Sequence, residues 1–222
     1  MRFANRAQAG QMLAQKLLSY AGRPHVVVLG LPRGGVPVAY EVAEALEAPL
    51  DVLVARKLGV PGFEELAMGA VASGGARVLN EDVLAETEVP WAEVEAATQR
   101  EMREIERREI EYRGGRPALA LHDRLVILVD DGLATGATMR AAIEAAKAQK
   151  PAGIVVAVPT GARETVIALR PLVADVVTVM TPDSFMAVGL WYVDFSPTTD
   201  EEVRSLLAKA ASFSQKESQP RE

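Results

Sequence analysis

The chain has 222 residues, with 24 Lys and Arg against 30 Asp and Glu, so its formal net charge is -6 at pH 7. This length can bury a hydrophobic core without disulfides or structural metals, which excludes a mini-protein scaffold. Cysteine is absent, which excludes disulfides, thiolate metal sites and a cysteine nucleophile. The acidic surplus argues against a nucleic-acid partner, because phosphate backbones are bound by a concentrated excess of Lys and Arg. A small phosphorylated ligand stays compatible with it.

Targeting signals are not apparent in the sequence. The opening residues, MRFANRAQAGQML, lack the apolar run and the small-residue cleavage site of a secretory signal. No apolar run approaches the roughly 18 residues that a membrane-spanning helix needs. We therefore expect a cytoplasmic protein without a membrane partner.

The first part of the chain predicts two helices around a strand. Apolar residues from Phe3 to Leu17 recur with helical spacing, which predicts an amphipathic helix that ends at Tyr20. The β-branched run HVVVLG at 25–30 is typical of a strand buried on both faces, and VAYEVAEAL at 38–46 resumes a helical pattern.

Strand and helix patterns continue to alternate along the rest of the chain. PLDVLVARK at 49–57 predicts a second strand, 67–80 predicts a β-hairpin that turns near 73–75, and the densely charged segment 90–116 predicts a long surface helix. Further strands are expected at 125–131, 153–159 and 175–182, and further helices at 139–149 and 163–171. This alternation predicts an α/β fold whose open, mainly parallel sheet is flanked by helices.

The most informative segment is VILVDDGLATGATMR, residues 126–140. A buried strand ends in Asp130 and Asp131, the chain turns through glycines, and a helix follows. Amides and hydroxyls at 135–138 can hold an anion at the helix N-terminus. Without a Walker lysine, a phosphomonoester fits better than a polyphosphate, and the acids can accept hydrogen bonds from vicinal hydroxyls, so ribose 5-phosphate is a suitable ligand. The alternative is that the acids cap the helix and the glycines only turn the chain.

The string VILVDDGLATGAT resembles the phosphoribosyl-pyrophosphate (PRPP) signature of type I phosphoribosyltransferases, and the resemblance runs from Val26 to about Pro182. It implies the fold of that family, with a small hood or flap. It also implies that Asp130 and Asp131 contact the ribose hydroxyls. Mg²⁺ would be held mainly by PRPP, with help from the same two acids. The residues that the resemblance assigns to the 5-phosphate are Ala134, Thr135, Gly136, Ala137 and Thr138.

A second glycine-containing loop, LPRGGVP at 31–37, lacks the spacing of a dinucleotide-binding turn. In the resembled family this place belongs to the pyrophosphate loop, often with a non-proline cis peptide. Arg56 and Lys57 resemble the family's pair of cations that contact pyrophosphate. A glycine turn beside a surface arginine, and a solvated strand end, are the alternatives. The residues assigned to pyrophosphate are Arg33, Gly34, Gly35, Arg56 and Lys57.

Two further parts carry candidate residues. The 90–116 helix lies where many members of the resembled family have a mobile flap. If it moved about a hinge at 114–115, its arginines could reach pyrophosphate. The alternative is a solvated helix face, because Glu104 lies four residues before Arg108. The C-terminal hood is expected to stack a planar base, although aromatic residues there can also fill the core. The flap candidates are Arg107, Arg108, Arg113 and Arg116, and the acceptor candidates are Phe185, Trp191, Tyr192 and Asp194.

Together these residues predict one domain over 1–210, with a core of about 24–182, a helical insertion of about 90–116 and a hood of about 181–200, followed by a disordered tail over 211–222. The resemblance implies an enzyme that transfers ribose 5-phosphate from PRPP to a nitrogenous base, depends on Mg²⁺ and releases pyrophosphate. A non-catalytic regulator that senses PRPP or a nucleotide on the same fold is the alternative, and a hydrolase or carrier of another sugar phosphate is a third. The expected partners are PRPP and a nucleobase-like acceptor, and a homodimer is possible.

Overall fold

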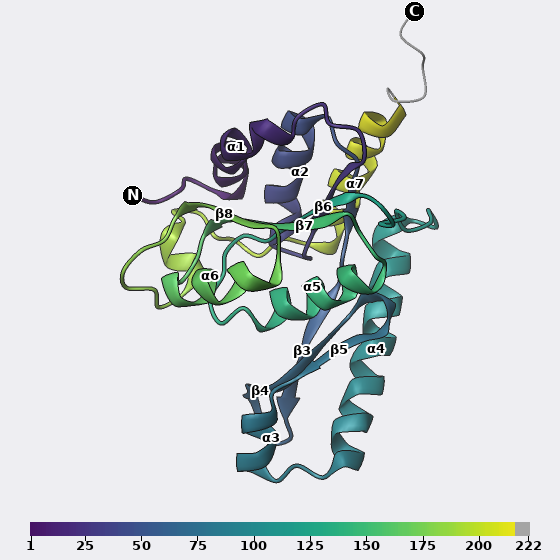
Figure 1. Cartoon of the computed structure of the whole chain (residues 1–222), viewed down its shortest axis with the longest axis vertical. Coiled ribbons are helices and arrows are strands. Elements are labelled where there is room, and N and C mark those ends of the chain that lie inside the picture. The colour runs from purple at the N-terminus through teal and green to yellow at the C-terminus, as the bar shows by residue number, and fades with distance from the viewer. Residues whose placement is uncertain (216–222) are drawn as a thin grey trace, which may run out of the picture.

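The computed structural model describes residues 1–215. Its centre is a five-stranded parallel sheet in the order β2-β1-β6-β7-β8 (Figure 1). The strands are β1 (Val26–Gly30), β2 (Leu50–Val52), β6 (Leu125–Val129), β7 (Gly153–Thr160) and β8 (Asp175–Met180).

Helices cover both faces of this sheet (Figure 1). On one face lie α1 (Arg6–Leu17), α2 (Gly35–Leu46) and α7 (Asp200–Gln215), and on the other lie α5 (Ala137–Ala148) and α6 (Arg163–Leu169). Side chains of β1 alternate between the two cores: Val26 and Val28 pack with α1 and α2, whereas Val27 and Leu29 pack with α5 and α6. Burial on both faces explains the uninterrupted β-branched runs in the sequence. The predicted α/β class is confirmed.

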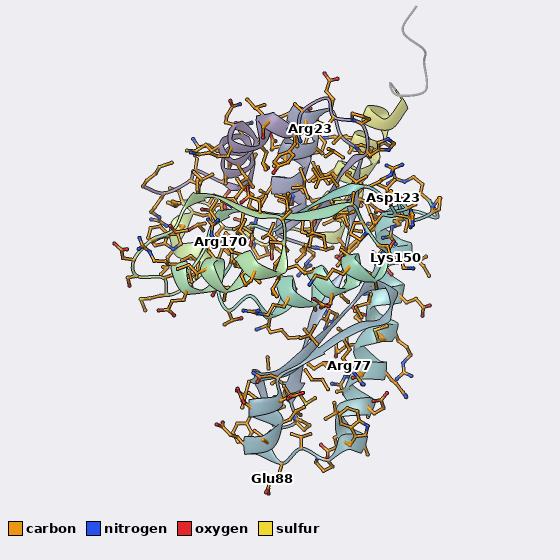
Figure 2. The ribbon with its side chains drawn as sticks, viewed as in Figure 1. Arg23, Arg77, Glu88, Asp123, Lys150 and Arg170 are labelled. Atoms are coloured by element: carbon orange, nitrogen blue, oxygen red, sulfur yellow. The ribbon has the colours of Figure 1, made fainter. Side chains whose placement is uncertain are left out.

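A second, antiparallel sheet extends away from the parallel one (Figure 1). We call residues 55–113 the antiparallel lobe; it contains β3 (Ala55–Val60), β4 (Phe63–Ala72), β5 (Ala76–Leu79), α3 (Glu81–Thr87) and α4 (Trp91–Arg113). Arg77 of β5 donates from Nη1 to Glu95 of α4 at 2.8 Å, and its guanidinium lies 5.2 Å from the Trp91 ring centre. Figure 2 shows Arg77 within the lobe and Glu88 at its far end.

The lobe corrects the prediction of one strand over 49–57. The chain leaves the parallel sheet after Val52, because the backbone N–H and C=O of Val54 pair with the hydroxyl oxygen and N–H of Ser73, at 2.9 and 2.8 Å. The predicted hairpin is confirmed as β4–β5, with a short 3₁₀ turn over Ser73–Gly75. Helix α3, which follows the N-cap Asn80, was missed.

The two ends of the chain also differ from the predictions. The first helix begins only at Arg6, because Phe3 instead pairs with Tyr192 in an isolated β-bridge. The predicted long helix is confirmed as α4. Helix α7 continues to Gln215, so 211–215 of the predicted tail are helical, and 216–222 lie outside the described residues. Over the described part of the chain, no helix combines the length and apolar character that crossing a membrane requires.

Candidate functional site

The candidate loops lie together at the carboxyl edge of the parallel sheet. Strands β1 and β6 are neighbours in register, with Gly30 opposite Val129, so the segments that follow them leave the sheet side by side. The N–H of Leu31 donates to the Val129 carbonyl at 2.8 Å, which ties the first loop to the second. In open parallel sheets this edge is where ligands bind.

Glycines let the first loop approach the two acids closely. A Cβ added to Gly34 would lie 2.1 Å from Oδ2 of Asp131, and one added to Gly35 would lie 2.7 Å from the Val129 carbonyl oxygen and 2.8 Å from Cα of Asp130. No larger residue fits either place without a shift of backbone or carboxylate. The peptide bond between Pro32 and Arg33 is cis, as the resemblance implied for this loop.

The second loop is held by the end of β7 and by α6. Leu133 donates from N–H to the Thr160 carbonyl at 2.9 Å, and the Thr165 hydroxyl donates to the Ala134 carbonyl at 2.5 Å. Gly136, the N-cap of α5, has φ +78°, a conformation that glycine adopts readily. The first amides of α5 have no intrahelical partners, so they can bind an anion beside the exposed Thr135.

The two acids sit at the centre of these loops and are only partly accessible. Oδ1 of Asp130 accepts the N–H of Asp131 at 2.9 Å, and the Asp131 carbonyl accepts the Tyr192 hydroxyl at 2.6 Å. Burial raises the pKa of Asp130 well above its ordinary value, and the charge of Asp131 adds to this. Burial also raises the pKa of Asp131, although the nearby Arg6 guanidinium opposes that effect.

Sequence reasoning missed Arg6. This residue donates from Nε to Oδ2 of Asp131 at 2.8 Å and from Nη1 to the Ser196 carbonyl at 2.7 Å, and its guanidinium lies 4.0 Å from the Phe195 ring centre. The available signal was local: Arg6 is a cation in the first turn of a helix, where the helix dipole favours acids. Such a mismatch often marks a functional position.

Arg56 and Lys57 are successive residues of β3, so their side chains alternate between its two faces, although both line a cavity of about 490 Å³ beside α4. Arg56 forms a short ion pair with Glu101 of α4. Lys57 also lines a second cavity of about 490 Å³, together with Thr135 and Ala137 of the second loop, and Arg56 does not. The structure therefore brings Lys57 toward the candidate phosphate loop and ties Arg56 to the lobe. It also corrects the prediction that both cations close the second parallel strand, since both lie in β3 of the antiparallel sheet.

The four arginines that were flap candidates, three in α4 and Arg116 just after it, all have partners in the protein. Arg107 and Arg108 pair with Glu104 at 2.9 and 2.7 Å, as the alternative of a solvated helix face predicted. Arg113 pairs with Asp51, and Arg116 donates to the backbone carbonyl of Arg113 at 3.1 Å. Arg33 is exposed on the first loop.

The hood, residues 181–199, packs against the N-terminal segment. The N–H of Phe3 donates to the Trp191 carbonyl at 2.8 Å, and the buried Tyr192 ring lies 5.4 Å from the Phe3 ring. Tyr192 therefore fills the core of the hood, and its hydroxyl is already used. Phe185 stacks on Trp191 at 6.3 Å, and the buried Nε1 of Trp191 has no hydrogen-bond partner among the described residues.

Asp194, the last acceptor candidate, lies exposed on the hood. Its Oδ1 accepts the hydroxyl of Ser196 at 2.6 Å and the N–H of the same residue at 3.0 Å. These hydrogen bonds lower the pKa of the Asp194 carboxyl, so the group stays ionised at neutral pH. Asp194 thus lies close to the Arg6 contact at Ser196 and remains open to solvent.

The donors that the two acids offer to a metal ion are carboxylate oxygens. The described residues contain no cluster of three or more His, Asp or Glu side chains that could enclose a metal. Asp130 and Asp131 offer two carboxylates side by side, and hard oxygen donors suit Mg²⁺, which keeps several waters and phosphate ligands. The donor set therefore fits a magnesium ion that the ligand itself holds for the most part.

The sequence profile described as "Phosphoribosyl transferase domain" matches residues 3–188, and the chain belongs to this family. It is 47% identical over 208 residues to a Mycobacterium tuberculosis protein named "putative phosphoribosyl transferase"; the match covers 94% of this chain and 47% of that protein, so the chain spans about half the length of that relative. The crystal structure of TT1426 from Thermus thermophilus is similar, with a TM-score of 0.80, 44% identity and coverage of 94% of this chain and 99% of that one.

Proposed function

We propose that the protein is a phosphoribosyltransferase that transfers the 5-phosphoribosyl group from PRPP to a nitrogen heterocycle and releases pyrophosphate. The observation that carries this proposal is the close packing of two glycine loops around one pair of acids. Gly34 and Gly35 approach Asp131 and Asp130 so closely that a single Cβ does not fit, and the anion-binding end of α5 begins a few residues further on.

This arrangement suits a ligand that carries phosphate at both ends of a sugar. In the proposed complex, the residues from Ala134 to Thr138 bind the 5-phosphate through the amides at the start of α5. Asp130 and Asp131 accept hydrogen bonds from the ribose hydroxyls. Arg33, the amides of the first loop and Lys57 bind pyrophosphate, and the proposal leaves Arg56 out because it pairs with Glu101.

The residues supply charge and position rather than a nucleophile. The anomeric C–O bond breaks with its electron pair on pyrophosphate, and the lone pair of the acceptor nitrogen forms the new C–N bond while its proton is released. Positive charge that develops on the ribose ring is stabilised by Asp130 and Asp131, and negative charge on pyrophosphate by the first loop and Lys57. Holding both reactants in line also contributes to the rate enhancement.

Magnesium is part of the proposal. The carboxylates of Asp130 and Asp131 would help to hold the ion, whose charge would offset that of pyrophosphate when PRPP is bound. The acceptor would lie between the acids and the hood, near Phe185 and Trp191. Support for this placement comes from the Arg6–Asp131 contact, which joins the hood side of the structure to the acids.

The test is to measure pyrophosphate release from Mg²⁺·PRPP by the full chain across a panel of purine and pyrimidine bases, and to identify the nucleotide product by mass spectrometry. We expect release with one base or a small group of related bases, and its loss in Asp131→Asn. Arg107→Gln, on the solvated face of α4, is the matched control and should keep full activity.

Other outcomes would point to the alternatives. Tight PRPP binding with no turnover for any base would favour the regulator that senses PRPP. Binding of a different sugar phosphate without binding of PRPP would favour the hydrolase or carrier. No binding of PRPP by calorimetry would overturn both the transferase and the sensor.

A further inference from the structure

Arg6 lies where the N-terminal helix, the hood and the acids meet. Its guanidinium is held from three sides: Asp131 accepts from Nε at 2.8 Å, the Ser196 carbonyl accepts from Nη1 at 2.7 Å, and the Phe195 ring lies beneath it at 4.0 Å. A Cβ added to Gly34 would also lie 3.2 Å from Nε of Arg6. Arg6 therefore contacts Asp131 and the hood, and it lies next to the first loop.

The ion pair is shielded from water. The side chains of Arg6 and Asp131 are only 12% and 14% exposed, so solvent screens their attraction far less than that of a surface pair. The planar guanidinium donates to two acceptors in fixed directions, and a lysine ammonium does not reproduce that geometry. Arg6 thus fixes the orientation of the Asp131 carboxylate.

The pair leaves oxygen atoms available for a ligand. Arg6 engages only Oδ2 of Asp131, and no other described side chain contacts Oδ1 through a hydrogen bond. In Asp130, Oδ1 accepts the N–H of Asp131, and no described residue donates to Oδ2. Each acid therefore keeps one carboxylate oxygen for a hydroxyl group while the Arg6 contact stays in place.

We propose that Arg6 is a positioning residue of the sugar site, which turns Oδ1 of Asp131 toward one of two vicinal hydroxyls and so makes the site selective for ribose over deoxyribose. This inference rests on the proposed function. Arg6 acts through Asp131, whose backbone carbonyl accepts a hydrogen bond from the Tyr192 hydroxyl at 2.6 Å. Without Arg6, we expect the Asp131 carboxylate to lose this orientation, so that its hydrogen bond to the 2-hydroxyl has no fixed direction.

The experiment measures binding of ribose 5-phosphate and of 2-deoxyribose 5-phosphate by calorimetry, in the wild type, Arg6→Gln, Arg6→Lys and Arg2→Gln. Arg2 is the matched control, because it is also an N-terminal arginine that donates to the hood, at the Tyr192 carbonyl, and makes no contact with Asp131. Thermal melting of each variant establishes that it is folded, and Mg²⁺·PRPP is titrated into the wild type in parallel.

We expect the wild type and Arg2→Gln to prefer ribose 5-phosphate, and Arg6→Gln to reduce this preference about ten-fold, the size of one lost charge-assisted hydrogen bond. Arg6→Lys should restore part of it. A preference that is unchanged in Arg6→Gln, or equal weakening of both sugars, would overturn the inference and leave the proposed function intact. Tighter binding in Arg6→Gln would overturn it too, because Arg6 would then block the site. Failure of the wild type to bind PRPP would instead overturn the proposed function.

Discussion

Arg113 of α4 donates from Nε to both carboxylate oxygens of Asp51 in β2, at 3.0 and 3.1 Å, and so joins the antiparallel lobe to the edge of the parallel sheet. The side chains are 12% and 8% exposed. Arg113 also donates to the Val52 carbonyl at 3.0 Å, and Asp51 accepts the N–H of Leu119 at 3.0 Å. The junction is therefore a buried, hydrogen-bonded pair and not a free hinge.

Removal of one partner from this junction should destabilise the protein strongly. Arg113→Ala leaves the Asp51 carboxylate buried without its cation, and we expect the free energy of unfolding to fall by about 3–5 kcal/mol. Arg107→Ala, in the same helix but with a 57% exposed side chain, should cost less than about 1 kcal/mol. Urea denaturation of the two variants tests the comparison, and similar losses in both would contradict it.

The contact between Gly34 and Asp131 should make Gly34→Ala damaging for ligand binding. The new Cβ would lie 2.1 Å from Oδ2 of Asp131, so the carboxylate must move. A displacement of about 1 Å at a reacting centre can reduce activity about 100-fold. Gly153→Ala is the control, because its Cβ would meet the flexible end of Leu125 at 3.2 Å and make an ordinary contact with the Ala174 Cβ at 4.0 Å. Pyrophosphate release and calorimetry with Mg²⁺·PRPP measure the activity and the binding of both variants, and a thermal melt separates either loss from lost folding.

Lys57 and Arg56 should have different roles although they are adjacent. Lys57→Ala removes a cation from the cavity that contains Thr135, and we expect PRPP affinity to fall about ten-fold or more. Arg56→Ala should affect affinity little and stability more, because it leaves Glu101 without its principal partner. If Arg56→Ala lowers affinity as much as Lys57→Ala does, the assignment of the two residues to different faces is wrong.

The raised pKa of Tyr112 predicts that the folded protein loses stability at high pH. Burial, together with a 2.6 Å hydrogen bond to Asp200, raises its pKa to about 12, above the ordinary value of 10.0. Because the folded state holds the proton more tightly, the contribution of this group is complete below pH 10 and is lost as the pH rises through about 12. The free energy of unfolding should therefore fall between pH 10 and 12 less steeply in Tyr112→Phe than in the wild type. Equal slopes in urea denaturation would refute this.

The sequence was informative wherever a pattern was local. Strands such as β1 and β6 are buried on both faces, so their sequences are continuous apolar runs, and the glycine loops follow them directly. The split of 49–57 was not predictable in this way, because it depends on pairing between Val54 and Ser73, nineteen residues further along the chain. Helix α3 is short, and α7 was missed although its buried residues Val203, Leu207 and Ala210 recur with helical spacing.

The candidate site also contains residues that a local sequence pattern predicts and residues that it does not. Asp130 and Asp131 were found because strand, acids, loop and helix are contiguous. Arg6 was missed because its partner Asp131 lies 125 positions away, and a single arginine carries no periodic signal. Phe3 was assigned to a helix for a similar reason: its apolar character was apparent, but its bridge to Tyr192 was not.

The bridge between Phe3 and Tyr192 has a consequence for the order of folding. It closes a loop of nearly the whole domain, and such long-range contacts are costly in chain entropy before they form. We therefore expect the hood to join the N-terminal segment late in folding. The chain has two tryptophans: Trp91 lies in the antiparallel lobe and Trp191 lies in the hood. Variants that keep one tryptophan each would let fluorescence follow the folding of the lobe and of the hood as separate events.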